Sequence, residues 1–230
     1  MRLLDFAPHG RDKRHPMGVQ VKICGINSVE AADAALDAQA DFAGLVFYRK
    51  SPRNLAPEQA RALAARMRGR LSLVALFADA GDEEIAAAVG AAAPDFLQLH
   101  GAESPERVSA VRTRFGVPVI KAVAVAEASD LVGAARYDAD MLLFDAKGAS
   151  PGGNGTAFDW QLLRGRKFTR PWLLAGGLNA QNVARAIASA SAPGVDASSG
   201  VEESPGIKSP QMIRDFIAAA RTAHYASASP

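Results

Sequence analysis

The chain has 230 residues, of which 49% are apolar and 22% are charged, and these values are ordinary for a globular protein with a substantial core. A formal net charge of +2 and the lack of a stripe of basic and aromatic residues argue against a nucleic-acid partner. The single cysteine excludes a disulfide framework and fits a reducing compartment, which predicts a cytoplasmic location. Because no apolar run approaches the roughly 18 residues of a membrane span, no membrane partner is expected.

The two ends of the chain are predicted to lie outside the folded domain. Residues 1–18 are basic but lack the apolar centre of a secretory leader, so they are expected to form a flexible extension, and Met17 is a candidate start. Residues 223–230 are expected to be a disordered tail. Residues 19–222 are then expected to form the one folded domain.

Eight apolar segments of strand length alternate with eight helical segments. The predicted strands are 19–23, 42–47, 71–77, 96–100, 117–125, 141–145, 172–175 and 195–198, and the predicted helices are 28–38, 57–68, 82–92, 104–114, 127–135, 158–163, 179–189 and 209–220. Such alternation indicates an α/β protein with a parallel sheet covered by helices, and eight units predict one closed (β/α)8 TIM barrel. An open doubly wound sheet is the alternative, and eight units over this length favour closure.

The first predicted strand contains the only cysteine of the chain, in Val21-Lys22-Ile23-Cys24-Gly25. Because side chains alternate along a strand, Lys22 and Cys24 share one face. A cation next to a thiol favours the reactive thiolate, so Lys22 is predicted to lower the pKa of Cys24 below that of a free thiol. The alternative is a buried structural cysteine, since free cysteine is among the most buried residue types.

Polar residues stand near the C-terminal ends of several predicted strands, although buried parallel strands usually have unbroken apolar sequences. They are Lys22 and Cys24, Gln98 and His100, Asp145, and Asp196 and Ser198. In a barrel enzyme these strand ends form the mouth of the active site. A thiol on the first strand and a carboxyl group on the sixth would face each other there as an acid–base pair. The alternatives are a core histidine for His100 and a loop or cap residue for Asp145.

Glycine-rich segments follow the sixth, seventh and eighth predicted strands. They are Gly152-Gly153-Asn154-Gly155-Thr156, Gly176-Gly177-Leu178-Asn179 and Ser198-Ser199-Gly200. Glycine lets the backbone approach an anion closely, and barrels hold phosphate groups after strands seven and eight. A small phosphorylated substrate is therefore expected, with ordinary turns as the alternative explanation of the glycines.

Taken together, these motifs resemble the phosphoribosylanthranilate isomerase family over about residues 19–220. The matching segments are Lys22-Ile23-Cys24-Gly25, Gly44-Leu45-Val46-Phe47 with Ser51-Pro52-Arg53, Gln98-Leu99-His100-Gly101, Leu143-Phe144-Asp145, Gly152-Gly153-Asn154-Gly155 before Phe158-Asp159-Trp160, Ala175-Gly176-Gly177-Leu178-Asn179, and residues 195–202. No single segment is specific, but the set is.

The resemblance implies a barrel enzyme of tryptophan biosynthesis that needs no cofactor and no metal. Its reaction would convert N-(5′-phosphoribosyl)anthranilate into 1-(2-carboxyphenylamino)-1-deoxyribulose 5-phosphate by an Amadori rearrangement. Carried over by position, Cys24 is the general base, Asp145 is the general acid, and Arg53 meets the anthranilate group. The phosphate cradle would comprise Gly155, Gly177, Ser199 and Gly200, together with Gly176, Asn179 and Ser198 from the same segments. Lys22, His100 and Asp196 are also expected to bind substrate.

Other functions are considered beside this one. A sugar-phosphate epimerase would need metal-ligating histidines on several strands, which His9, His15, His100 and His224 do not supply. The related histidine-pathway isomerase is expected to have a carboxylate in place of Cys24. An inactive phosphoribosyl-binding barrel would need neither the thiol nor the opposed carboxyl group. The sequence leaves open whether the protein is a monomer or a homodimer.

Overall fold

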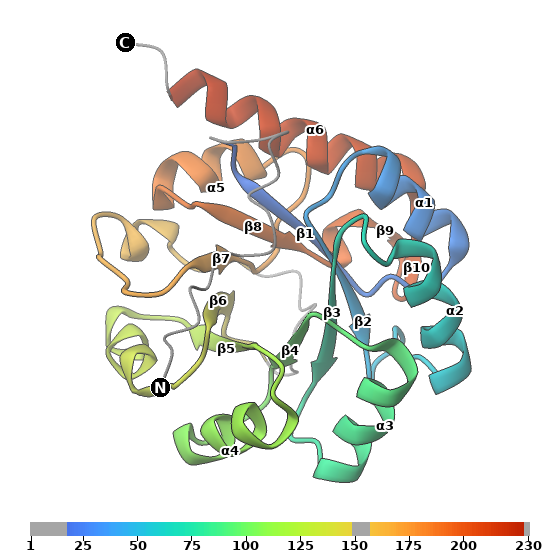
Figure 1. Ribbon diagram of the computed structural model, residues 1–230. Helices are drawn as coiled ribbons and strands as arrows, with labels where there is room; N and C mark the ends of the chain where they lie inside the picture. Colours follow the sequence, from blue (N-terminus) through green and yellow to red (C-terminus); the bar gives the residue numbers. More distant parts are fainter. Residues whose placement is uncertain (1–17, 149–156, 228–230) are drawn as a thin grey trace.

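Eight parallel strands form a closed barrel in which β1 to β8 pair in chain order and β8 pairs with β1. The computed structural model describes residues 18–148 and 157–227. The strands are β1 (Gln20–Cys24), β2 (Phe42–Val46), β3 (Ser72–Phe77), β4 (Phe96–Leu99), β5 (Val119–Val125), β6 (Met141–Ala146), β7 (Trp172–Leu174) and β8 (Gly194–Ala197). The predicted barrel is therefore confirmed, and the open sheet is excluded (Figure 1).

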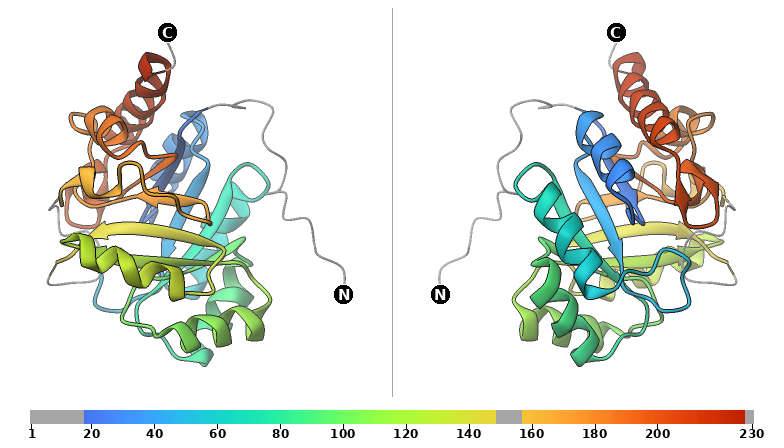
Figure 2. Two further views of the ribbon diagram at one scale, coloured as in Figure 1. Left: turned by 90° about the vertical axis from the view of Figure 1, so that its left-hand side faces the viewer. Right: turned by 90° about the vertical axis from the view of Figure 1, so that its right-hand side faces the viewer.

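Helices surround the outside of the barrel, as Figures 1 and 2 show. The α-helices are α1 (Val29–Asp37), α2 (Pro57–Met67), α3 (Asp82–Ala92), α4 (Pro105–Phe115), α5 (Val183–Ala190) and α6 (Pro210–Ser227). Two of the predicted helices are 3-10 helices instead, η1 (Ala128–Arg136) and η2 (Trp160–Leu163). The first contains Ser129, Asp130 and Gly133, which are poor formers of α-helix, and the second is only four residues long. Within the described residues, no helix has the length and apolar character needed to cross a membrane.

The segment after β8 contains elements that the sequence analysis does not predict. These are a short 3-10 helix, η3 (Ser199–Val201), and an antiparallel hairpin of β9 (Glu202–Ser204) and β10 (Ile207–Lys208). Strands of two or three residues are too short to show an alternating pattern. In addition, α6 continues to Ser227 and so includes the first part of the predicted tail at 223–230. Residues 1–17 of the predicted extension, and 228–230, lie outside the described residues.

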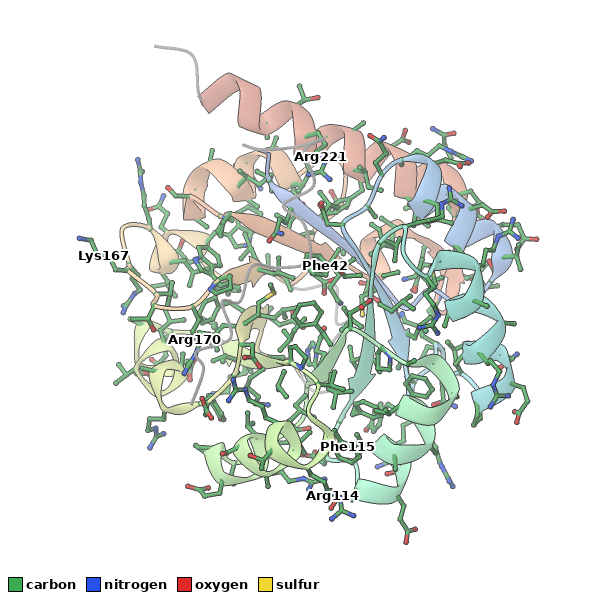
Figure 3. The ribbon with its side chains drawn as sticks, viewed as in Figure 1. Phe42, Arg114, Phe115, Lys167, Arg170 and Arg221 are labelled. Carbon is green, nitrogen blue, oxygen red and sulfur yellow. The ribbon has the colours of Figure 1, made fainter. Side chains whose placement is uncertain are left out.

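Inward- and outward-facing side chains of the strands build two separate apolar layers. The inner layer fills the barrel with Phe42, Val74, Phe96, Ile120, Ala122, Met141, Leu143, Leu173 and Ala175. Phe42 lies at the centre of the barrel in Figure 3, and its ring meets that of Phe96 edge to face at a centroid distance of 5.9 Å. The outer layer packs the barrel against the helices and includes Val21, Ile23 and Phe216. Below its mouth the barrel is thus a packed core.

Aspartates that precede β2, β4 and β6 tie together the N-terminal end of the barrel. Asp41, Asp95 and Asp140 accept the backbone N–H groups of Val21, Leu73 and Val119 at 2.7, 2.8 and 2.8 Å. The three donors lie at or near the starts of β1, β3 and β5. At these positions a backbone N–H group has no partner on the strand that follows, and the aspartate supplies one. Arg221 of α6 also binds the Asp41 carboxylate, at 2.7 Å, and so attaches the last helix to the same end (Figure 3).

We predict that Asp140→Ala lowers the free energy of unfolding by about 1–3 kcal/mol, because it leaves the buried N–H of Val119 without an acceptor. Denaturant unfolding measures the effect. The matched control is Asp140→Asn, which keeps an acceptor oxygen and weakens only the ion pair with Arg112. Turnover of both variants should equal that of the unmodified protein, because this end is opposite the mouth. Equal destabilisation by the two substitutions would contradict the prediction.

Candidate active site

A pocket opens at the C-terminal ends of the strands and brings together most of the predicted site residues. Its lining includes Cys24, Arg53, His100, Asp145, Gly176, Gly177, Asp196, Ser198, Ser199 and Gly200. Among the described residues, Val46, Tyr48, Ser51, Leu76, Ala175 and Leu178 also line it. The sequence analysis does not single out these last residues as site residues. Tyr48 and Ser51 precede Arg53 in the same loop, and this proximity was the signal that could have identified them.

Of the predicted site residues that the structure describes, Lys22 and Asn179 do not line the pocket. Lys22 is completely buried below Cys24. The carboxamide oxygen of Asn179 accepts the N–H groups of Gln181 and Asn182 at 3.0 and 3.1 Å, so this side chain stabilises the turn before α5. That Asn179 belongs to the phosphate cradle stays a prediction. Gly155 lies outside the described residues.

The inward face of β1 carries a buried ion pair beneath the thiol. The Lys22 ammonium lies 3.0 Å from Oδ1 of Asp196, its register partner on β8. On the other side of β1, Gly44 of β2 is the register partner of Cys24. A Cβ atom at position 44 would lie 3.0 Å from Sγ of Cys24 and 3.2 Å from Nζ of Lys22. Glycine therefore leaves the space in which the thiol and the ammonium meet.

The charge states of this cluster differ from the sequence-based prediction. Burial raises the pKa of the Cys24 thiol and outweighs the opposing effect of the Lys22 charge. The prediction that this pKa lies below that of a free thiol is therefore wrong. Burial opposes the charge of Lys22 as well, but the Asp196 carboxylate and the neighbouring Cys24 outweigh it, so the pKa of Lys22 is raised. Lys22 thus remains a permanent cation beside a thiol that is protonated at neutral pH.

Asp145 ends the inward face of β6 and is bound on both carboxylate oxygens. Its Oδ1 accepts the N–H of Ala146 at 2.8 Å, and its Oδ2 lies 3.0 Å from Nε2 of His100. Gly176, at φ +91°, makes room for this carboxyl group, since a Cβ there would stand 2.8 Å from the backbone N of Ala146 and 3.2 Å from Oδ1. The thiol of β1 and the carboxyl of β6 thus meet in the same pocket.

Arg53 is held in the pocket wall by the hairpin that follows β8. Its Nε and Nη2 atoms each lie 2.7 Å from an oxygen of Glu202, and Lys208 lies 2.7 Å from the same carboxylate. Burial opposes ionisation of Glu202, but the bonds from Arg53 and the charge of Lys208 outweigh it, so the pKa of Glu202 is lowered. A guanidinium has five N–H donors, so two bonds to Glu202 leave donors for a substrate carboxylate.

The glycine-rich segments after β7 and β8 lie side by side at one wall of the pocket. Gly176, Gly177, Ser198, Ser199 and Gly200 all contribute to the lining. The ammonium group of Lys208 donates to the backbone oxygen of Ser198 at 2.9 Å and so fixes the position of the segment after β8. This wall offers backbone groups and small side chains, which suit an anion such as phosphate. In the described part of the chain, no cluster of three or more His, Cys, Asp or Glu side chains could hold a metal ion.

Comparison with known proteins gives consistent matches over the whole barrel. The family model described as N-(5′-phosphoribosyl)anthranilate (PRA) isomerase matches residues 21–219. The N-(5′-phosphoribosyl)anthranilate isomerase of Beijerinckia indica is 50% identical over 211 residues, which cover 89% of this chain and 95% of that protein.

Solved structures show the same similarity. The phosphoribosyl anthranilate isomerase of Thermotoga maritima is 38% identical, with a TM-score of 0.81, and the match covers 89% of this chain and 99% of that one. Another phosphoribosyl anthranilate isomerase structure, solved in complex with reduced 1-(o-carboxyphenylamino)-1-deoxyribulose 5-phosphate, is 36% identical, with a TM-score of 0.77 and the same coverage.

We predict that the rate of Cys24 alkylation rises with pH and reaches half its maximum above the range of a free thiol, because burial raises the pKa of Cys24. Lys22→Met should move this midpoint to higher pH, because it removes the stabilising cation. Asp196→Asn should move it to lower pH, because the Asp196 charge opposes thiolate formation. The single cysteine makes the label unambiguous. A midpoint that ignores both substitutions would contradict this electrostatic coupling.

Proposed function

Because the chain belongs to the N-(5′-phosphoribosyl)anthranilate isomerase family, it is an isomerase of tryptophan biosynthesis, and we propose that Cys24 and Asp145 supply the base and the acid of its reaction. The reaction converts N-(5′-phosphoribosyl)anthranilate into 1-(2-carboxyphenylamino)-1-deoxyribulose 5-phosphate. The observation that supports the assignment is the meeting of a thiol and a carboxyl group in one pocket, from strands β1 and β6 on different sides of the barrel.

In the proposed mechanism Asp145 first gives a proton to the ring oxygen of the sugar. The ring opens as the C1–O bond breaks, and the anilino nitrogen and C1 form a Schiff base. Cys24, as the thiolate, then takes the proton from C2, and the electron pair moves to give an enolamine. Tautomerisation of the enolamine yields the ketone. Each of these proton transfers is general acid–base catalysis, which typically contributes about 10²–10⁴-fold to a rate.

The buried cluster explains how the base can form. Because burial raises the pKa of Cys24, the thiolate is the minor species at neutral pH. The raised pKa of Lys22 keeps its ammonium charged, so a cation is always in place to stabilise the thiolate when it forms. Asp196 holds that ammonium at 3.0 Å and in turn lines the pocket. Lys22 and Asp196 thus support the base from below.

Two walls of the pocket are proposed to bind the two ends of the substrate. We propose that the free donors of Arg53 bind the carboxylate of the anthranilate group and that the segments at Gly177, Ser199 and Gly200 receive the phosphate. His100 contacts Asp145 and faces the same space. The proposed chemistry needs neither a metal nor a cofactor. It requires a reduced thiol, which supports the proposal of a cytoplasmic location.

Neither a nucleic-acid partner nor a membrane partner is part of the proposal. Monomer and homodimer both stay predictions, and sedimentation velocity on the full chain separates them by mass.

We predict that Cys24→Ser lowers kcat by at least about 10²-fold, because a hydroxyl is far harder to deprotonate than a thiol, and that Asp145→Asn does the same by removing the acidic proton. Turnover is followed by the loss of anthranilate-type fluorescence. The control is the affinity of each variant for reduced 1-(o-carboxyphenylamino)-1-deoxyribulose 5-phosphate, called the reduced product analogue below. This affinity should stay within about twofold, since neither role concerns binding. Near-normal turnover of either variant would refute its assignment.

We also predict that Arg53→Lys weakens binding of the reduced product analogue by roughly 1.5–3 kcal/mol, because lysine cannot reproduce the planar donor set that meets a carboxylate. Titration calorimetry compares this ligand with one that lacks the carboxylate. The second ligand should bind both proteins almost equally. As a control, Glu202→Gln weakens the hydrogen bonds that hold the Arg53 side chain in place but keeps Arg53 itself. Equal losses for the two ligands in Arg53→Lys would show that Arg53 serves only the loop.

A further inference from the structure

Gln98 is a buried polar residue that the proposed mechanism does not use. It lies on the inward face of β4 and has no solvent exposure. Its Nε2 lies 2.8 Å from Nδ1 of His100, while its Oε1 is buried and has no hydrogen-bond partner among the described residues. A buried amide that leaves one of its polar atoms unpaired is costly, so such a residue calls for an explanation. The explanation offered by the geometry is its contact with His100.

We propose that Gln98 is a positioning residue that pairs with Nδ1 of His100 as a donor in the unliganded protein and as an acceptor when Asp145 is protonated, and that it sets the hydrogen bonding of Asp145 through His100. This inference rests on the proposed role of Asp145 as the acid. Gln98 reaches His100, and His100 reaches Asp145, so the three side chains form one chain of contacts at 2.8 and 3.0 Å. Only the last member touches the reacting atoms in the proposed mechanism.

The direction of each hydrogen bond follows from the first one. An amide nitrogen can only donate, so Nε2 of Gln98 donates to Nδ1 of His100, which must then be the unprotonated nitrogen. In a neutral imidazole the proton is therefore on Nε2, and this N–H donates to Oδ2 of Asp145. The N–H of Ala146 donates to Oδ1. With donors on both oxygens, this arrangement suits the carboxylate, the form that follows proton transfer to the substrate.

The opposite arrangement requires the amide of Gln98 to turn over. If Asp145 carries a proton on Oδ2, it donates to Nε2 of His100, and the imidazole proton lies on Nδ1. Nδ1 then needs an acceptor, and a half-turn of the amide supplies Oε1 in place of Nε2. A glutamine is compatible with both states, whereas a side chain that only accepts or only donates would favour one of them. Glutamine thus lets the proton move between the two residues without loss of either bond.

The backbone on both sides of His100 is held in place by hydrogen bonds. Lys121 of β5 donates to the carbonyl oxygens of Leu99 and Gly101, on either side of His100, at 3.2 and 2.8 Å. Its ammonium also binds Glu103 at 2.7 Å, in a buried ion pair. The N–H of His100 itself donates to the carbonyl of Phe77 at 2.8 Å. A fixed backbone makes the Gln98 amide the adjustable member of the chain.

The direct test is the tautomer of His100 in the full chain, measured by long-range ¹H–¹⁵N correlation at one pH after labelling with ¹⁵N-histidine. The four histidines are His9, His15, His100 and His224, and His100→Asn identifies the signal. In the unliganded protein we expect a protonated Nε2 and an unprotonated Nδ1. In Gln98→Glu the side chain only accepts, so the proton should appear on Nδ1. An unmodified protein with the proton on Nδ1, or on both nitrogens, would overturn the proposal, and this measurement needs no variant.

Turnover supplies the second readout. Gln98→Met keeps the length of the side chain but removes its hydrogen bonds, and we expect kcat to fall about tenfold or more, a part of the roughly 10²–10⁴-fold contribution of a positioned acid. The affinity for the reduced product analogue should stay within about twofold. Leu97→Met, a neighbour on the outer face of β4, is the control and should leave kcat unchanged. Gln98→Met with normal kcat and an unchanged His100 tautomer would refute the proposal. If instead Asp145→Asn keeps its turnover, the acid is misassigned, while the tautomer of His100 is still tested independently.

Discussion

The site depends on one ion pair at the seam where the barrel closes. Lys22 of β1 and Asp196 of β8 are register partners, and their charged groups meet at 3.0 Å, where Lys22 has no exposure. A buried ammonium is tolerated only if a carboxylate compensates for the lost water, and removing one partner leaves an uncompensated charge. Closure of the barrel is thus what allows a cation to exist beneath Cys24. The register that pairs the strands also fixes the distance between the cation and the thiol.

Buried cations recur behind the pocket, each with a different task. Lys22 serves the thiol, Lys208 joins Glu202 to the segment at Ser198, and Lys121 holds the backbone around His100. Each ammonium donates to a carboxylate, and two of them also donate to backbone carbonyl oxygens. Three donors on a compact head suit such divided contacts, whereas the planar fork of Arg53 suits a carboxylate. These lysines therefore hold the surroundings of the acid and the base in place.

Much of the fold could be predicted from sequence because its signals are local. Alternation within strands such as 19–23 and their repetition at regular spacing indicate both the barrel and the inward direction of Lys22 and Cys24. Other features depend on tertiary contacts. The bonds between Arg53 and Glu202, which are 149 residues apart, exist only once the loops are folded, whereas the turn contacts of Asn179 are local, to residues two and three positions ahead. Likewise, spacing shows that Lys22 is near Cys24 but not how much water the thiol loses, and that loss determines its pKa.

The raised pKa of Cys24 is consistent with the role of a base and also has a chemical consequence. The thiolate is the species that alkylating and oxidising agents attack, so a thiol that stays protonated at rest is protected from them. The cost is a small population of the reactive form, and the fixed Lys22 charge limits that cost by stabilising the thiolate whenever it appears. If Lys22 were an exposed lysine, water would screen its charge and this effect would be weak. Burial therefore both raises the pKa of the thiol and strengthens the interaction with Lys22 that opposes the rise.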